Sequence, residues 1–511
     1  MRSRTLQKGK RTALRRGSQP GSGIKRQSVR AYALCVLLIV CSLAVCSVHI
    51  TAGSELVSEL RSVSRSAHLR GSRFGLAVYD IKRNQYILSV HKDRTLIPAS
   101  NQKLLISSSA LLELGPDFTF FTGIYMSGTI KNGELDGYIC LKGGGDPNLS
   151  GRFNSEDIYA PVRKWVDAVR EAGIRNINGP VLIDDSMFDR EFFHPSWPEK
   201  QAHKWYAAEC GALSLNDNCI DLTIRPGKRG EPALWSFVPY TGYITVKNKC
   251  RTVRGKSARR IIISRRGTEI TIGGSIGERS KGFFTHVPVH DPGLFTGAVF
   301  GRLLAKNGIQ AEYIARVGKP LNYDRLIKIC GIETQPLSET IRVMNARSQN
   351  MYAEMLLKYL GYRKKGKGTF ANGREAIKDI LKKHGFDMKG ILLDDGSGLS
   401  RKNRVSADAL VRILRLMYES EYRKTFLRSL AVPGDQYGTL RKYLRGEKLQ
   451  GVIYGKSGYI SRVKALSGYA VRDDGNVLVF SFLVNNYNPK SGWNINRLKS
   501  TLMKTLVNAA Y

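Results

Sequence analysis

Segments with the pattern of β-strands occur at both ends of this chain, and this arrangement limits the possible folds more than any other feature. Apolar residues alternate or run continuously over 74–80 and 86–92, and again over 450–456, 465–472 and 477–485. Helical segments separate the two sets. The pattern therefore predicts one sheet assembled from the two ends of the chain, with the middle of the chain as an insertion.

A length of 511 residues exceeds what one ordinary core supports, so two to four units are expected. We predict an α+β fold in which residues 55–145 and 331–511 form one split domain. Residues 146–330 read as many short strands, and we predict an inserted, mostly β region there. Helical periodicity predicts helices over 100–114, 160–172, 293–307, 350–360, 373–384, 406–417 and 494–509.

The N-terminus carries a topology signal. Residues 1–30 contain ten Lys or Arg and no Asp or Glu, and residues 31–52 contain none of these four types. This order predicts a cytoplasmic flank followed by a membrane anchor or a signal peptide. The length favours an uncleaved anchor, and cleavage stays open. The rest of the chain is expected to be exported, in the periplasm or on the extracytoplasmic face of the cytoplasmic membrane.

The net charge of +39 suggests a nucleic-acid partner at first sight. The first 52 residues account for ten of these charges, which leaves 71 basic against 42 acidic residues, a net of +29. No helix-turn-helix, zinc-finger or RNP-type motif accompanies the charge, so nucleic acid is not an expected partner. On an exported protein the excess favours attraction to anionic lipid headgroups and acidic peptides, and a generally basic proteome is the alternative explanation.

The cysteines allow two interpretations. No C-x-x-C pair occurs, so a zinc knuckle or a thioredoxin-type site has no support. In an exported chain Cys210 and Cys219 are candidates for a short disulfide loop, whereas the alternative is that most cysteines are small buried residues. The cysteines beyond the apolar segment are Cys140, Cys210, Cys219, Cys250 and Cys330.

Three short motifs carry the candidate chemistry, and the first is Ser100-Asn101-Gln102-Lys103 at the start of a predicted helix. A spacing of three places Lys103 one turn from Ser100 on the same face. A serine hydroxyl becomes a nucleophile when a base takes its proton, and a lysine serves as that base once its pKa is lowered.

The second motif is Ser348-Gln349-Asn350, which precedes a predicted helix, and the third is Lys456-Ser457-Gly458, at the end of a predicted strand. Each motif alone is equally explained by a helix cap or a turn. Together and in this order they form the set used by serine acyl-transferases of the S-x-x-K type.

Longer blocks extend this pattern over residues 72–490. With them the chain resembles the D-alanyl-D-alanine carboxypeptidase/endopeptidase family, the DacB-like low-molecular-mass penicillin-binding proteins. The resemblance implies a penicillin-binding/β-lactamase-like transpeptidase domain, an antiparallel sheet flanked by helices, with an insertion that forms one or two small domains. The matching blocks are PASNQK (98–103), GGGDPNL (143–149), DDSMF (184–188), ALSLNDN (212–218), SQNMYAEMLL (348–357), DGSGLS (395–400), GTLR (438–441) and KSGYISRVKALSGY (456–469).

The resemblance implies a covalent mechanism on peptidoglycan stem peptides. Ser100 would attack the carbonyl between two terminal D-alanines, with Lys103 as the base. Ser348 and Lys456 would form a second proton path to the leaving amine, and Asn350 would orient the substrate amide. Water would then hydrolyse the acyl-enzyme.

The third motif would bind the substrate. Ser457 would hydrogen-bond the terminal carboxylate, Gly458 would let the substrate backbone lie against the strand, and the N–H groups of Ser100 and Tyr459 would form the oxyanion hole. Two positions depart from the family pattern. Ser457 stands where Thr is usual, which keeps the hydroxyl, and Tyr459 stands where a small or polar residue is commoner.

The resemblance also implies β-lactam antibiotics as covalent ligands, DD-endopeptidase as a further activity, membrane contact through the N-terminal segment, and no cofactor or metal. Two alternatives stay open. A β-lactamase-like hydrolase shares the three motifs but lacks the long insertion and the GGGDP and DGSGLS blocks. An inactive cell-wall-binding relative would be expected to have lost the motifs.

Overall fold

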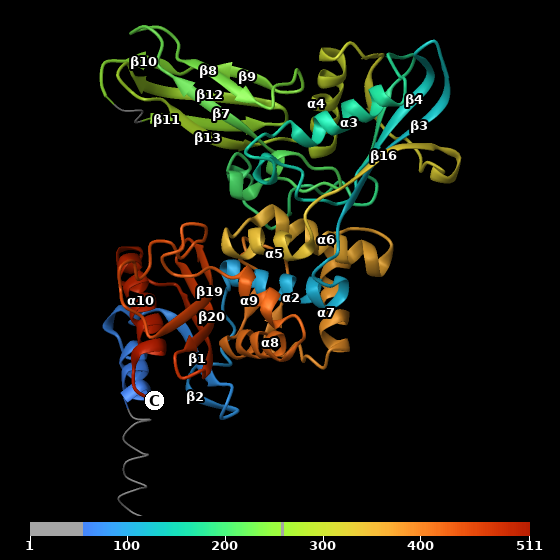
Figure 1. Cartoon of the computed structure of the whole chain (residues 1–511). Helices are drawn as coiled ribbons and strands as arrows, with labels where there is room; N and C mark the ends of the chain where they lie inside the picture. Colours follow the sequence, from blue (N-terminus) through green and yellow to red (C-terminus); the bar gives the residue numbers. More distant parts are fainter. Residues whose placement is uncertain (1–54, 257–259) are drawn as a thin grey trace, which may run out of the picture. The chain divides into compact units, whose positions relative to one another are not determined.

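The computed structural model describes residues 55–256 and 260–511 (Figure 1). Val57–Ala509 forms one compact unit. The predicted basic flank, 1–30, and the predicted apolar segment, 31–52, lie outside the described residues. Within the described part of the chain, no helix has both the length and the apolar composition needed to cross a bilayer.

The two ends of the compact unit meet in one antiparallel sheet with the strand order β19-β20-β21-β1-β2. β1 pairs with β21, so that Leu76 lies opposite Phe482. The predicted sheet is therefore confirmed. Its strands are β1 (Arg73–Asp80), β2 (Gln85–Val90), β19 (Gly451–Ile460), β20 (Val463–Arg472) and β21 (Val477–Asn485).

Helices cover both faces of this sheet. Helix α10 (Gly492–Asn508) packs on one face, and α8 (Ala407–Glu419) packs on the other (Figure 1). Since both faces are covered, every residue of β21 is buried. The other helices of this layer are α5 (Leu337–Ala346), α6 (Asn350–Lys365), α7 (Phe370–Lys383) and α9 (Arg423–Ser429), of which α9 contacts α8.

Helix α2 (Lys103–Leu114) lies at the centre of the helical layer, in contact with α5, α6, α7 and α8. Its residues from Lys103 to Leu111 are all buried, the serines at 107–109 included, because helices pack around it on several sides. The helix ends where Gly115 adopts a φ of 77°. The short 3-10 helix η2 (Ala99–Gln102) precedes α2, so Ser100 stands at the entrance to the core.

The inserted region has its own sheets and a second apolar core. Strands β3 and β4 pair with β5, β6 and β16 there, so this region begins near Phe121 and ends near Glu333, which lie opposite one another. The predicted boundary at residue 145 is therefore too late, because the sequence pattern of a strand does not state which sheet it joins. The strands are β3 (Phe121–Lys131), β4 (Glu134–Lys142), β5 (Asn176–Ile177), β6 (Val181–Asp184), β14 (Gln310–Ala311), β15 (Ile314–Arg316) and β16 (Ile327–Glu333).

Two further sheets complete the insertion, with the orders β13-β7-β8 and β10-β12-β11, β9 pairing with β12. Helices α3 (Ala160–Glu171) and α4 (Pro292–Lys306) pack on each other, with Trp165 against Phe300. The strands are β7 (Cys219–Arg225), β8 (Leu234–Val238), β9 (Thr245–Asn248), β10 (Arg251–Val253), β11 (Arg260–Arg266), β12 (Glu269–Gly277) and β13 (Phe283–Pro288).

The structure does not contain the Cys210–Cys219 disulfide, which is one of the two interpretations of the cysteines. Both residues are free thiols, and both side chains are buried in the core that contains α2. The thiol of Cys210 donates instead to the carbonyl oxygen of Phe192 at 3.6 Å. Burial of these two cysteines agrees with the alternative interpretation, in which they pack as small apolar residues.

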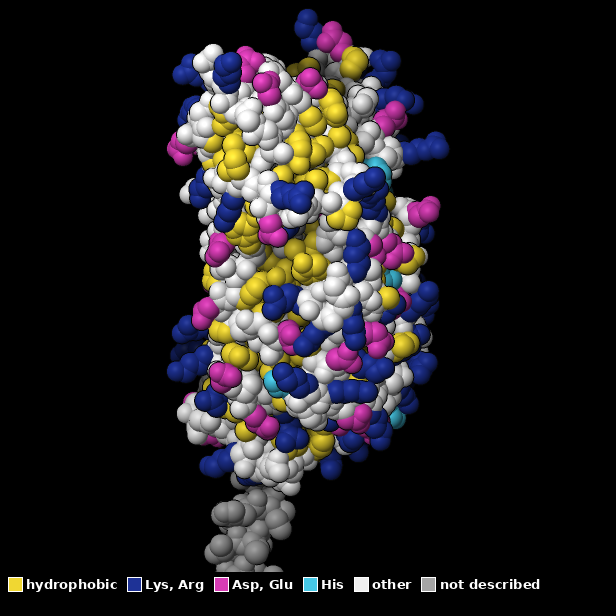
Figure 2. Space-filling view, turned by 90° about the vertical axis from the view of Figure 1, so that its right-hand side faces the viewer, with side chains coloured by type: hydrophobic (Ala, Val, Ile, Leu, Met, Phe, Trp, Pro, Cys, Tyr) yellow, Lys and Arg dark blue, Asp and Glu magenta, His cyan; other side chains and the backbone are white. Residues whose placement is uncertain are grey.

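Basic residues are dispersed over the surface. On the face shown in Figure 2, Lys and Arg side chains extend from one end to the other with Asp and Glu among them. Nucleic-acid binding favours a continuous basic stripe. The basic residues on this face do not form one.

Candidate active site

The predicted nucleophile and base lie within hydrogen-bonding distance. Lys103 Nζ donates to Ser100 Oγ at 3.2 Å, as the spacing of three residues predicts. The residue before the serine, Ala99, has a φ of 46°, a strained conformation for a residue with a Cβ. The backbone is thus bent where the serine side chain meets the cavity.

The ammonium group of Lys103 is enclosed by neutral acceptors. Its Nζ donates to Asn350 Oδ1 at 2.7 Å and to the carbonyl oxygen of Ser397 at 2.7 Å, in addition to Ser100. The side chain is fully buried and forms no ion pair with a described residue. Burial lowers the pKa of Lys103 to about 7, although the charges of Glu354 and Asp395 oppose this shift. A neutral amine is therefore accessible near neutral pH, and such an amine can accept the serine proton.

A second serine–lysine pair faces the first. Lys456 Nζ donates to Ser348 Oγ at 2.9 Å and to the carbonyl oxygen of Ser457 at 2.8 Å. Burial holds the pKa of Lys456 well below its ordinary value, and the positive charges of Lys103 and Lys499 add to this effect. Ser348 lies between α5 and α6 with a φ of 64°, so the junction rather than a regular helix presents its hydroxyl.

The third motif, Lys456-Ser457-Gly458, lies in the middle of β19. It was predicted at the end of a strand, but β19 continues to Ile460. A Cβ at Gly458 would lie 2.9 Å from the carbonyl oxygen of Pro98 and 3.1 Å from the nitrogen of Ser100, so glycine is what lets β19 pass the nucleophile. Ser457 Oγ donates to Thr439 Oγ1 at 2.9 Å. The ring of Tyr459 is 67% exposed at the rim of the cavity.

Asn350, which is predicted to orient a substrate amide, lines the cavity and also contacts the predicted base. Its Oδ1 accepts from Lys103, and its Nδ2 donates to the carbonyl oxygen of Tyr206 at 2.6 Å. Both ends of this side-chain amide are thus held by the protein. The geometry makes Asn350 a positioning residue for Lys103, tied to a loop of the insertion.

A buried carboxylate orders the loop behind the base, and the sequence interpretation did not identify it. Glu354 accepts from the N–H groups of Gly396 at 2.8 Å and Ser397 at 2.7 Å. The carbonyl of the same Ser397 accepts from Lys103. Burial, and then the charge of Asp395, raises the pKa of Glu354 to about 8. The matching block 348–357 marked this helix, but no spacing indicated what its glutamate contacts.

Asp395 stabilises the same loop. Its carboxylate accepts from the N–H groups of Gly398 at 2.8 Å and Ser400 at 2.6 Å. It also accepts from the Trp197 indole at 2.8 Å and the Asn403 amide at 2.7 Å. The DGSGLS block is therefore the loop that supports Lys103, fastened by Trp197 to the inserted region.

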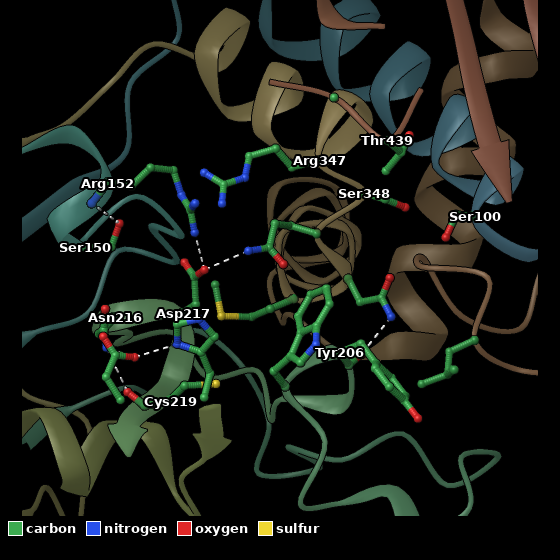
Figure 3. A pocket seen from close by; sticks show the side chains of 18 of the residues that line it. Ser100, Ser150, Arg152, Tyr206, Asn216, Asp217, Cys219, Arg347, Ser348 and Thr439 are labelled. Atoms are coloured by element: carbon green, nitrogen blue, oxygen red, sulfur yellow. Dashed lines mark hydrogen bonds and ion pairs between the residues drawn. The ribbon is translucent and has the colours of Figure 1, made fainter. Parts of the chain in front are cut away.

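The reacting groups open into a cavity of about 1080 Å³. Its walls include Ser100, Ser348 and Asn350, and it continues into the inserted region past Thr439 to Arg152 and Asp217 (Figure 3). A cavity of this size with convergent polar groups is typical of a ligand site. No group of three His, Cys, Asp or Glu among the described residues is arranged to hold a metal ion.

Comparisons with known proteins agree with this geometry. The family model described as "D-Ala-D-Ala carboxypeptidase 3 (S13) family" matches residues 56–505. The chain is 31% identical to the D-alanyl-D-alanine carboxypeptidase of Actinomadura sp. (strain R39), over 85% of this chain and 81% of that protein. It is 24% identical to the D-alanyl-D-alanine carboxypeptidase DacB of Haemophilus influenzae, over 82% of this chain and 86% of that protein.

A solved structure shares the fold. The crystal structure of penicillin binding protein 4 (dacB) from Haemophilus influenzae superposes with a TM-score of 0.73 at 22% identity, covering 84% of this chain and 93% of that chain. The predicted α+β fold of the penicillin-binding type is thereby confirmed.

Proposed function

Because this chain belongs to the D-Ala-D-Ala carboxypeptidase 3 (S13) family, we propose that it is a serine-type D-Ala-D-Ala carboxypeptidase acting on peptidoglycan stem peptides. The observation that carries the proposal is the contact between Ser100 Oγ and Nζ of a fully buried Lys103 at 3.2 Å. It supplies a nucleophile with an adjacent base whose pKa is lowered to about 7.

Acylation starts when Lys103 takes the proton of Ser100 and Ser100 Oγ attacks the carbonyl carbon between the two D-alanines. The N–H groups of Ser100 and Tyr459 stabilise the oxyanion, a contribution of about 3–4 kcal/mol for each donor. The close passage of β19 beside the nitrogen of Ser100 supports this assignment.

The leaving amine receives its proton through Ser348, whose hydroxyl is in contact with Lys456. Ser457 and Thr439 offer adjacent hydroxyls to the carboxylate of the leaving D-alanine. Water then attacks the acyl-enzyme, and Ser100 recovers its proton. The same attack on a β-lactam leaves a slowly hydrolysed acyl group on Ser100.

Labelled penicillin tests the nucleophile. We expect covalent labelling of the native chain, no labelling of Ser100→Ala, and normal labelling of Ser461→Ala, which alters an exposed serine on the same cavity wall. Labelling that survives in Ser100→Ala would show that another residue is the nucleophile. Mass analysis of pentapeptide products should show release of D-alanine, and rapid turnover of the β-lactam would favour a β-lactamase instead.

We also propose that the enzyme works on the extracytoplasmic side of the cytoplasmic membrane, held there by residues 31–52. The order of a basic stretch and an uncharged apolar stretch supports this location. A membrane-impermeant penicillin should label the protein in intact cells, and labelling only after lysis would contradict the proposal.

A further inference from the structure

The cavity continues beyond the catalytic hydroxyls to two arginines that lack acidic partners. Arg347 and Arg441 both line it, and neither forms an ion pair or a side-chain hydrogen bond with a described residue. In Figure 3, Ser348 and Thr439 lie between Arg347 and Ser100. The hydroxyls of Ser348 and Thr439 therefore separate the positive charge of Arg347 from the nucleophile.

Two of the three acids on this wall are already engaged. Asp217 forms an ion pair with Arg152 and accepts from Gln349 Nε2 at 2.8 Å. Asp221 contacts His286 Nδ1 at 2.6 Å. The third acid, Glu156, is exposed, so solvent screens its charge.

The side chains of Arg152 and Arg347 point toward one another in Figure 3. Arg152 Nε is buried and has no hydrogen-bond partner among the described atoms. Two guanidinium groups thus converge beside one carboxylate, that of Asp217, which pairs with Arg152 and Gln349 but not with Arg347. An incoming carboxylate would find the unpaired guanidinium of Arg347, in the planar arrangement that arginine offers to carboxylates.

The proposed function indicates which part of the substrate would reach these arginines. Ser348 protonates the leaving amine, and Ser457 and Thr439 hold the carboxylate beside it, so the space beyond them receives whatever else the leaving group carries. A single D-alanine ends at these hydroxyls. The leaving group of a cross-linked dimer is a second stem peptide, which continues past them and carries further carboxylates.

We propose that Arg347, with Arg152 beside it and Arg441 elsewhere on the cavity wall, forms a carboxylate-binding subsite for the acidic leaving peptide when the enzyme cleaves a cross-link. This inference rests on the proposed function and deepens it. The subsite contributes to cleavage of dimers and is empty during release of D-alanine from a monomer. It therefore sets the preference between endopeptidase and carboxypeptidase reactions.

The test compares two substrates in Arg347→Gln. These are a pentapeptide monomer and a muropeptide dimer joined by a D-Ala–meso-diaminopimelate bond. We expect the ratio of kcat/KM for the dimer to kcat/KM for the monomer to fall about tenfold, as for loss of one charge-assisted contact. Arg342→Gln is the matched control, because Arg342 also lies over the Tyr437 ring, at 4.3 Å against 5.7 Å for Arg347, but pairs with Glu339 and does not line the cavity.

A dimer with amidated carboxyl groups on the leaving stem gives a second measurement. The native enzyme and Arg347→Gln should cleave it at similar rates, because the interaction is already absent. An unchanged substrate ratio in Arg347→Gln, or an equal loss on both substrates, would overturn the subsite. A native enzyme that releases D-alanine but cleaves no dimer would also overturn it and leave the proposed function standing. Failure of penicillin labelling in the native chain would overturn the proposed function itself.

Discussion

The chemistry at Ser100 depends on one buried amine. Lys103 Nζ has three neutral acceptors and no carboxylate in contact, which is why burial can lower its pKa to about 7. A lysine with the same spacing from a serine on a solvent-exposed helix would stay protonated at neutral pH. The difference between a surface S-x-x-K and a catalytic one therefore lies in what surrounds the lysine.

This environment predicts the pH dependence of acylation. Below pH 7 Lys103 is an ammonium ion and cannot take the proton of Ser100, whereas above pH 7 it is a free amine. The rate of acylation by labelled penicillin should therefore rise with pH and reach half of its plateau near pH 7. Labelling reactions quenched at fixed times between about pH 5.5 and 8.5 measure this acylation rate. A flat profile over that interval would exclude Lys103 as the base.

At the scale of elements, the site forms where the start of α2, the α5–α6 junction and the middle of β19 come together. Helix and strand positions were predictable, because apolar periodicity reports which face of an element is buried. The contact between β19 and η2 joins residues more than 350 positions apart, so periodicity did not predict it, and only the family resemblance implied it. Gly458 is the residue that permits this contact.

Gly458→Ala should therefore displace β19 from the nucleophile. Its added Cβ would meet Pro98 and Ser100, and a shift of the oxyanion-binding strand should slow penicillin acylation about 100-fold. The matched control is Gly273→Ala in β12, where the nearest atoms lie 3.8 Å from the added Cβ. Equal acylation rates in the two variants would show that β19 tolerates a side chain at this position.

At the scale of the molecule, the inserted region is fastened to the catalytic half by buried polar contacts. Lys358 of α6 has a fully buried side chain, and its Nζ contacts Asp189 of the inserted region at 2.6 Å and the carbonyl oxygen of Glu191 at 2.8 Å. Together with the contacts of Asn350 and Asp395, this pair explains how a segment without catalytic motifs supports the site.

Asp189→Ala leaves the buried charge of Lys358 without its counter-ion and should lower the free energy of unfolding by about 3 kcal/mol. Asp379→Ala is the control, because Asp379 pairs with Lys365 at 3.0 Å on the surface, where loss of an ion pair costs about 0–1 kcal/mol. Denaturant unfolding measures both. The double variant Asp189→Ala with Lys358→Met should regain much of the loss, and a double variant less stable than Asp189→Ala would refute this account.

The sequence by itself determined the elements, the split sheet, the order of the three motifs and the family resemblance, because these are set by local periodicity and short-range spacing. It placed the boundary of the insertion too late, and it left open a disulfide between Cys210 and Cys219 that the structure does not contain. Only the tertiary structure decided which sheet β3 and β4 join, how Glu354 and Asp395 hold the loop behind Lys103, and where Arg347 faces the cavity. These depend on contacts between distant segments and on burial, and burial rather than spacing makes a lysine a base.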